Sequence, residues 1–207
     1  VRRQVRRLPP DCEGEKVMAK IVLVTGGARS GKSTFAESLA LQSGSRVGYI
    51  ATAEIWDREM SDRVELHRMR RPAEWITYEA PRDADAVLKE AAGELDFVLF
   101  DCLTVYTTNQ LLALPDTEPF RQRCEAVLNA VRQLTEAAKN FPGTVVFVTN
   151  EVGDGIVPDN KLAREFRDVA GLVNQHVAAV AEEVYWVVCG LPVEIKNRAR
   201  RTTGGTV

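Results

Sequence analysis

The chain has 207 residues, of which 27 are Lys or Arg, 29 are Asp or Glu, two are His and four are Cys. Its two ends, residues 1–17 and 196–207, together carry a net charge of +6, so the body between them carries −8 out of a total of −2. This distribution excludes a basic nucleic-acid-binding domain, whose positive charge would lie in the folded part. The apolar fraction of 45% is too high for a disordered protein, and the length suits one α/β domain.

The ends of the chain differ from its body in pattern as well as in charge. Residues 1–19 show no hydrophobic periodicity, and we expect a disordered extension there, or an upstream start codon with Met18 as the true initiator. We expect one domain over residues 20–196 and a loose basic tail over residues 197–207. Neither a secretory signal nor an apolar run of ~20 residues is visible, so no export and no membrane span are expected.

The four cysteines are isolated in the sequence. They form no CxxC pair and have no histidine nearby, so a zinc site is not expected. Reduced thiols in a cytoplasmic protein are the simpler interpretation.

From residue 20 onward, strand-like and helix-like patterns alternate. Continuous β-branched and aliphatic runs predict strands buried on both faces at residues 20–25, 46–52, 96–101 and 144–150. A shorter strand is expected at 76–80, and the last strands at 184–190 and 192–196. Helices are expected at 33–42, 57–68, 83–92, 118–140 and 160–183, and a further helix is expected to begin near residue 104. This alternation predicts a mostly parallel sheet with right-handed crossovers.

A phosphate-binding motif follows the first predicted strand. The segment GGARSGKS fits GxxxxGK[ST] and consists of Gly26, Gly27, Ala28, Arg29, Ser30, Gly31, Lys32 and Ser33. Glycines allow successive backbone N–H groups to surround a phosphate, at which the following helix aims its positive end. Lys32 is expected to contact the β- and γ-phosphates, and the Ser33 hydroxyl to bind Mg²⁺. A chance match in a Gly-rich turn is the alternative, but the flanking strand and helix favour a P-loop NTPase domain of RecA-like type.

Magnesium in such a site requires a carboxylate at the end of another strand. Asp101 ends the predicted strand at 96–101, which favours this role; the alternative is that it caps the helix beginning near Thr104. Glu151 also follows a predicted strand, and the sequence leaves a ligand-binding role and a plain loop position equally open for it.

The two histidines lie in different surroundings. His176 shares one helical face with Val173 and Val180, a pattern typical of a core or interface residue. His67 lies near the end of the helix predicted at 57–68, in the arginine-rich segment RVELHRMRRP. It is either a surface histidine favoured by the helix dipole, or an imidazole that surrounding guanidinium groups keep neutral and nucleophilic beside a phosphate. The residues alone leave both interpretations open.

Four segments of the chain resemble one known family. They are GGARSGKS, YIATAEIWDREMSDRVELHRMRRPAEW, VTNEVGDGIVP and REFRDVAGLVNQ. Together they are similar to the bifunctional adenosylcobinamide kinases/adenosylcobinamide-phosphate guanylyltransferases of cobalamin biosynthesis, in order and over residues 21–196. The P-loop is shared by many families, whereas the other three segments are much more specific.

The resemblance implies two reactions. Adenosylcobinamide is first phosphorylated on its aminopropanol hydroxyl by ATP or GTP. GMP is then transferred from GTP to that phosphate through a GMP–histidine intermediate, and the nucleophile of the family falls on His67. Some members have paired histidines at this point, where this chain has Leu66 before His67, so the nucleophile is unambiguous.

The resemblance also implies binding residues. Beside the P-loop, the nucleotide-binding positions are Ala51, Thr52, Ala53, Arg68, Met69, Arg70, Arg71, Glu79 and Asp101. Ser33 and Asp101 would hold Mg²⁺; some members carry Glu in place of Asp101, a longer side chain with the same charge. Family members are homotrimers, so a homo-oligomer is expected, and the Val173–Val180 stripe is either part of its interface or intrachain core.

Two rival functions predict different behaviour. A single-activity P-loop kinase would transfer a γ-phosphoryl group without covalent GMP, with His67 structural. A non-catalytic nucleotide switch would hydrolyse slowly and bind a protein partner. Only one P-loop is visible in the sequence, so we expect both reactions of the bifunctional enzyme to use one nucleotide site or overlapping parts of one.

Overall fold

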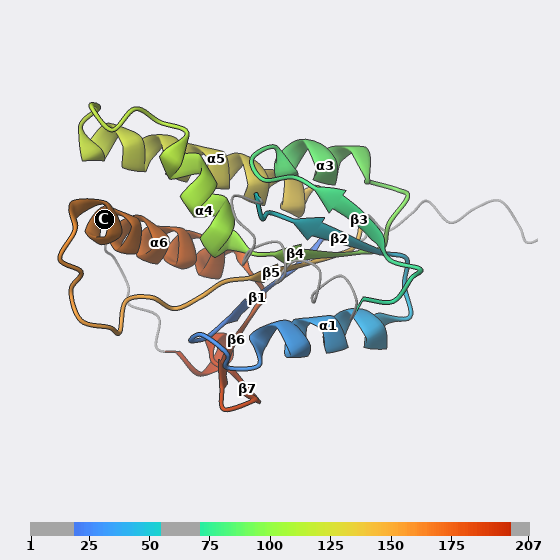
Figure 1. The fold of residues 1–207 in the computed structure, drawn as a ribbon. Helices are drawn as coiled ribbons and strands as arrows, with labels where there is room; N and C mark the ends of the chain where they lie inside the picture. Colours follow the sequence, from blue (N-terminus) through green and yellow to red (C-terminus); the bar gives the residue numbers. More distant parts are fainter. Residues whose placement is uncertain (1–18, 55–70, 200–207) are drawn as a thin grey trace, which may run out of the picture.

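The centre of the molecule is a seven-stranded sheet with the strand order β3-β2-β4-β5-β1-β6-β7 (Figure 1). A computed structural model describes residues 19–54 and 71–199. The strands are β1 Lys20–Thr25, β2 Val47–Ala51, β3 Ile76–Glu79, β4 Phe97–Asp101, β5 Thr144–Val148, β6 Glu183–Val188 and β7 Leu191–Glu194. Neighbouring strands pair in parallel, except that β7 pairs antiparallel with β6. The mostly parallel sheet predicted from the sequence is confirmed.

Helices cover both faces of the sheet. The helices are α1 Lys32–Ser43, α3 Ala84–Glu90, α4 Leu103–Leu112, α5 Phe120–Lys139, α6 Lys161–Val180 and the 3₁₀ helix η1 Lys196–Arg198. α1 lies on one face, and α3, α4, α5 and α6 lie on the other (Figure 1). Two clusters of buried apolar side chains result, one on each face, because the central strands are apolar on both sides.

Most element boundaries agree with the sequence pattern to within a few residues. Asp83 occupies the N-cap of α3, although its side chain makes no capping hydrogen bond there. The N-cap of α4 is Cys102, and Asp101 is the last residue of β4. The alternative interpretation of Asp101 as a helix cap is therefore wrong. The helix expected at 57–68 lies outside the described residues.

The amphipathic helix α6 packs its apolar face into the core. Val169, Val173 and Val177 are at most 1% exposed within the single chain. His176 is half-buried, and its Nε2 lies 3.0 Å from the Thr135 hydroxyl of α5. The Val173–Val180 stripe is thus intrachain core, with Val180 packed against its border.

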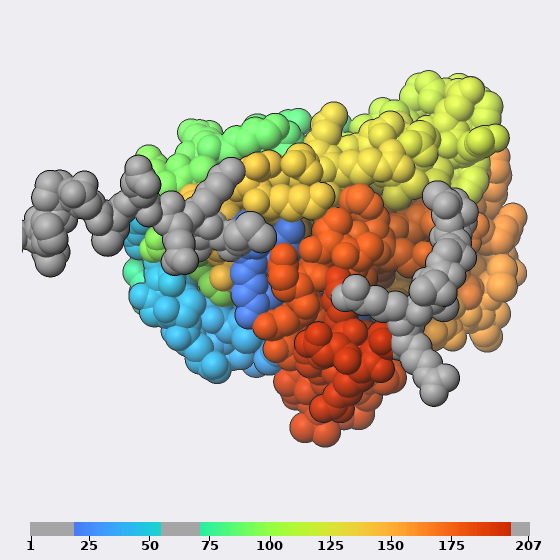
Figure 2. All heavy atoms as spheres, turned by 180° about the vertical axis from the view of Figure 1, so that it is seen from behind, coloured from blue at the N-terminus to red at the C-terminus, as the bar shows by residue number. Residues whose placement is uncertain are grey.

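An exposed apolar surface lies instead on the β6–β7 hairpin, which forms the lower projection of the molecule (Figure 2). Trp186 pairs with Val193 and Val188 pairs with Leu191, so these four side chains share one face. All four are exposed, Leu191 to 69%. None of the described helices combines the length and the hydropathy needed to cross a bilayer.

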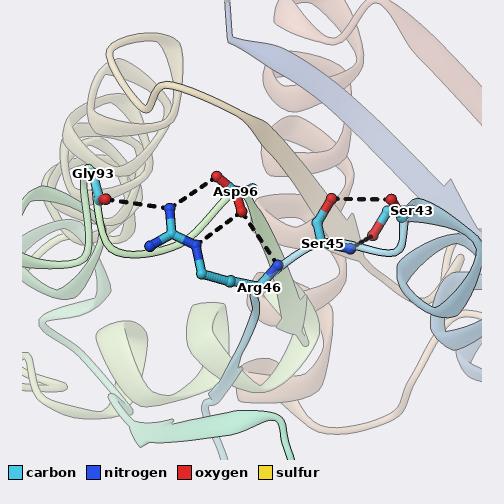
Figure 3. Close-up of polar contacts among 5 residues, drawn as sticks. All are labelled: Ser43, Ser45, Arg46, Gly93 and Asp96. Carbon is cyan, nitrogen blue, oxygen red and sulfur yellow. Dashed lines mark hydrogen bonds and ion pairs between the residues drawn. The ribbon is translucent and has the colours of Figure 1, made fainter. Parts of the chain in front are cut away.

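An ion pair joins β2 and β4 where these strands begin (Figure 3). The Arg46 guanidinium bonds both carboxylate oxygens of Asp96, with Nε–Oδ2 at 3.0 Å and Nη2–Oδ1 at 3.1 Å, and its Nη2 also donates to Gly93 O. These hydrogen bonds hold the pKa of Asp96 below its ordinary value. The pair is solvent-exposed, and it lies at the sheet edge opposite to the ends of the parallel strands.

Candidate functional site

The P-loop connects the end of β1 to the start of α1. Gly31 is the N-cap of α1 with φ 98°, and Arg29 has φ 57°, so the loop uses left-handed backbone conformations at two positions. A Cβ on Gly26 would lie 2.5 Å from the Val187 carbonyl oxygen, which requires glycine at the loop's first position. The loop therefore has the close backbone turn that exposes N–H groups to an anion at a helix N-terminus.

The tip of the β6–β7 hairpin supports the P-loop from one side. Gly190 N–H donates to Ser30 O at 2.8 Å. A Cβ on Gly31 would lie 3.0 Å from the Gly190 Cα, so the two glycines are in close contact. Cys189 and Gly190 both have positive φ, at 52° and 79°, and form the hairpin turn. Strand β6 thus brings the chain to the phosphate loop, and the antiparallel strand β7 leads away from it.

Lys32 is folded back across the loop. Its Nζ donates to Gly27 O at 3.1 Å, and the residue is only 9% exposed. Burial lowers the pKa of Lys32, and nearby Asp101 opposes this effect. A buried ammonium group whose hydrogen bond goes to a backbone carbonyl is well suited to bind an incoming phosphate, which would supply further negative charge beside it.

Asp101 lies at the end of β4. In the sheet, β5 lies between β4 and β1, the strand that leads into the P-loop. Tyr49 of β2 donates its hydroxyl to Asp101 Oδ2 at 2.8 Å. Across the described parts of the chain, Oδ1 has no hydrogen-bond partner. One carboxylate oxygen is thus fixed by Tyr49, whereas the other has no partner among the described residues.

The predicted strand-end residues lie along one edge of the sheet. Ala51 is in register with both Glu79 of β3 and Asp101 of β4, so these three residues lie side by side where parallel strands end. Glu79 is exposed, and Ala51 and Ala53 are half-buried. This edge is where open α/β sheets bind ligands.

Thr52 is fully buried and joins two strand ends. Its Oγ1 accepts from Cys102 N–H at 2.9 Å and donates to Cys102 O at 3.0 Å. Asn109 of α4, 7% exposed, donates from Nδ2 to Thr52 O at 2.8 Å and to Pro81 O at 3.1 Å. The end of β2, directly before the segment that contains His67, is therefore fixed to both β4 and α4.

The predicted nucleophile and its neighbours lie outside the described residues. His67, Arg68, Met69 and Arg70 fall within residues 55–70, while Arg71 is described. The Arg71 guanidinium carbon lies 3.4 Å from the Tyr49 ring centroid. Glu54, on the other side of the segment, is 3.1 Å from Arg82 in an ion pair. The two described residues that flank this segment, Glu54 and Arg71, are thus both held by contacts with other parts of the described structure.

The loop after β5 also contacts the P-loop. Glu151 N–H donates to Gly26 O at 3.1 Å, and Gly153 N–H donates to Glu151 Oε1 at 2.9 Å. The Arg167 guanidinium of α6 donates to the carbonyls of Gly153 and Gly155. Glu151 is therefore close to the phosphate loop, with one of its carboxylate oxygens already hydrogen-bonded.

The donor set at this edge fits magnesium. Ser33, the second residue of α1, and Asp101 would supply a hydroxyl and a carboxylate oxygen, and Mg²⁺ prefers oxygen ligands that also include phosphates and water. The hydrogen bond from Tyr49 to Asp101 Oδ2 orients the carboxylate, so it would not have to reorient when a metal ion binds. Ser33 and Asp101 remain predicted metal ligands.

Sequence reasoning missed two residues that shape the site. Tyr49 interrupts an apolar strand, and a buried tyrosine normally needs a partner for its hydroxyl, which is the signal that could have identified it. Asn109 is a buried amide within a helix, but no local pattern connects it with Thr52, 57 residues earlier.

Residues 22–195 match a family model described as cobinamide kinase / cobinamide phosphate guanyltransferase. The bifunctional adenosylcobalamin biosynthesis protein CobU of Salmonella typhimurium strain LT2 is 45% identical over 181 residues, which cover 85% of this chain and 99% of that protein. The bifunctional adenosylcobalamin biosynthesis protein CobP of Pseudomonas aeruginosa is 43% identical over 175 residues, covering 84% of this chain and 96% of that protein.

A solved ATPase from the type III secretion system of pathogenic bacteria has a similar fold, with a TM-score of 0.58 at 13% identity. The match covers 89% of this chain but only 60% of the ATPase. It supports the predicted α/β fold, a mostly parallel sheet flanked by helices. The family match and the two curated relatives are more specific, and from them it follows that the chain belongs to the cobinamide kinase / cobinamide phosphate guanyltransferase family.

Proposed function

We propose that this chain phosphorylates adenosylcobinamide with ATP or GTP and then converts the product to adenosylcobinamide-GDP with GTP. The observation that carries the proposal is the family match over residues 22–195, which includes the P-loop and the whole strand-end edge. The buried Lys32 and the half-satisfied Asp101 carboxylate support a nucleotide at this edge.

In the kinase step, the substrate hydroxyl oxygen attacks the γ-phosphorus, and the bond between this phosphorus and the β-phosphate oxygen breaks. ADP or GDP leaves, and the hydroxyl proton is released to water. Lys32 and the P-loop N–H groups hold the phosphates, so catalysis depends on positioning and charge neutralisation. Mg²⁺, held by Ser33 and Asp101, would neutralise part of the charge on the phosphate oxygens.

In the guanylyl step, neutral His67 attacks the α-phosphorus of GTP and pyrophosphate leaves. An oxygen of adenosylcobinamide phosphate then attacks the same phosphorus and the P–N bond breaks, which restores free His67. Arg68, Met69, Arg70, Arg71, Glu79 and the segment Ala51–Ala53 would surround the nucleotide in both steps. One site, or two overlapping sites, would thus serve both reactions.

The test separates this proposal from a single-activity kinase. The chain is incubated with adenosylcobinamide, ATP, GTP and Mg²⁺, and the products are identified by mass spectrometry. We expect adenosylcobinamide phosphate first and adenosylcobinamide-GDP afterwards. If the reaction stops at the phosphorylated product while GTP is in excess, the bifunctional proposal is wrong and the kinase alternative holds.

We also place the enzyme in the cytoplasm, consistent with its isolated cysteines, and propose a homotrimer. The exposed face formed by Trp186, Val188, Leu191 and Val193 supports subunit contact, because apolar surface on one side of a hairpin is commonly covered in an oligomer. Sedimentation equilibrium measures the subunit number, and a monomer at micromolar concentration would contradict this assembly.

A further inference from the structure

Tyr49 makes two contacts of different kinds with two parts of the site. It lies near the middle of β2 and is only 2% exposed. Its hydroxyl donates to Asp101 Oδ2 at 2.8 Å, and its ring lies under the guanidinium of Arg71, whose central carbon is 3.4 Å from the ring centroid. One side chain therefore connects the predicted magnesium carboxylate with the residue directly after the His67 segment.

The hydroxyl contact orients Asp101. A carboxylate at a strand end can rotate about its terminal torsion, so a hydrogen bond to one oxygen fixes the direction of the other. The Tyr49 hydroxyl thus sets the orientation of the Asp101 carboxylate.

The ring contact holds Arg71 in place. A guanidinium on an aromatic face is attracted by the ring quadrupole, most strongly where water is excluded. Arg71 Nε is buried and has no hydrogen-bond partner within residues 19–54 and 71–199, so the Tyr49 ring is an important contact of this side chain in the described structure. The contact holds the chain at Arg71, directly after residues 55–70.

We propose that Tyr49 is a positioning residue for both reactions: its hydroxyl presets the Asp101 carboxylate for the metal, and its ring holds Arg71, which directly follows the His67 segment. The inference rests on the proposed function, but its first half requires only that a metal–nucleotide complex binds at Asp101. The two halves are separable, because Phe keeps the ring and removes the hydroxyl, whereas Leu removes both.

The test compares Tyr49→Phe and Tyr49→Leu with the wild type in two measurements. The first is the affinity of the GDP-loaded protein for Mn²⁺, followed by electron paramagnetic resonance. The second is the rate at which GTP labelled at its α-phosphate marks the protein at saturating divalent cation. Thermal unfolding of each variant verifies that it is folded.

We expect both variants to bind Mn²⁺ about tenfold more weakly, the size expected for losing one hydrogen bond to a charged group. Labelling should stay within about twofold of the wild type in Tyr49→Phe and fall about tenfold in Tyr49→Leu, because only Leu removes the cation–π contact. Labelling retained in Tyr49→Phe would show that the ring, and not the hydroxyl, is what this step requires.

Tyr106→Phe is the matched control. Tyr106 is also buried, and its hydroxyl donates to Arg82 O at 2.9 Å, away from Asp101. It should match the wild type in both measurements. Unchanged Mn²⁺ affinity in Tyr49→Phe would overturn the first half of the proposal, and equal labelling of the Phe and Leu variants would overturn the second.

Failure of the proposed function has a different signature. A wild-type chain that takes up no covalent label contradicts guanylyl transfer and, with it, the Arg71 half of the inference. The Mn²⁺ measurement does not involve that chemistry and still decides the Asp101 half.

Discussion

His176 is the histidine whose surroundings the structure describes, and they explain its chemistry. Its Nε2 lies 3.0 Å from Thr135 Oγ1, and Thr135 in turn donates to Arg132 O. Burial lowers the pKa of His176, and the positive charges of Arg132 and Lys139 lower it further. These features describe a neutral packing residue between α5 and α6, as the sequence pattern predicts.

This lowered pKa predicts a pH-dependent stability. Because the folded-state pKa is below the ordinary value of about 6.5, the unfolded chain binds more protons as the pH falls through that value. The contribution of His176 to the free energy of unfolding should therefore be complete above about pH 6.5. Below that pH, the free energy of unfolding should decline. Urea unfolding at several pH values measures this, and His176→Gln should weaken the decline. An equally steep decline in His176→Gln would contradict this explanation.

The Cys102 thiol lies beside the candidate site but is not a reactive group there. Burial, with a further contribution from Asp101, raises the pKa of its thiol to about 12. At neutral pH the thiol is protonated and is not a competing nucleophile, although it directly follows Asp101. The residue instead contributes its backbone N–H and carbonyl to Thr52.

Helix α4 organises the strand-end edge. Asn109 reaches from α4 to the carbonyls of Thr52 and Pro81, and Thr104 Oγ1 accepts from Asn150 N–H at 2.8 Å. The helix thus contacts the ends of β2 and β5 and the start of the chain after β3. Its position fixes how three loops of the site lie relative to one another.

Asn109→Asp tests this role of α4. The substitution would place carboxylate oxygens against two carbonyl oxygens in a buried site, so we expect the free energy of unfolding to fall by about 2–3 kcal/mol. Gln110→Glu is the control, because Gln110 donates to Arg82 O from a more exposed position, and it should cost about 1 kcal/mol or less. Denaturant unfolding measures both. Equal losses in the two variants would contradict a special role for Asn109.

The elements themselves could largely be predicted from the sequence. The runs KIVLVT, FVLFD and TVVFV are apolar on both faces, and such runs form central parallel strands. What could not be predicted was the position of β7: its antiparallel pairing depends on the positive-φ turn at Cys189 and Gly190 and on contact with Ser30. That contact is between residues 160 positions apart, and no local pattern encodes it.

At the scale of the whole molecule, the Arg46–Asp96 ion pair and the candidate site lie at opposite ends of the parallel strands. The exposed Arg46–Asp96 pair joins strands at one end, whereas the P-loop, Asp101, Ala51 and Glu79 lie at the other. The P-loop and Asp101 could be predicted from motif and strand position alone. The contacts of Tyr49 and Thr52 could not, since they depend on the register of β2 with β4.

The negative charge of the body limits how the chain can bind nucleotides. The body of the chain carries −8, and the proposed nucleotides are anions, so binding must depend on local positive groups. Lys32 and the P-loop N–H groups are such groups within the described structure, and the arginines around His67 would add to them.

Covalent labelling of the protein with GTP marked at its α-phosphate tests the central claim most directly. We expect an acid-labile, alkali-stable label that His67→Ala abolishes, that His176→Ala retains, and that adenosylcobinamide phosphate discharges to adenosylcobinamide-GDP. Only two histidines occur in the chain, so these two variants test every histidine that could carry the label. A label that persists in His67→Ala would contradict the account.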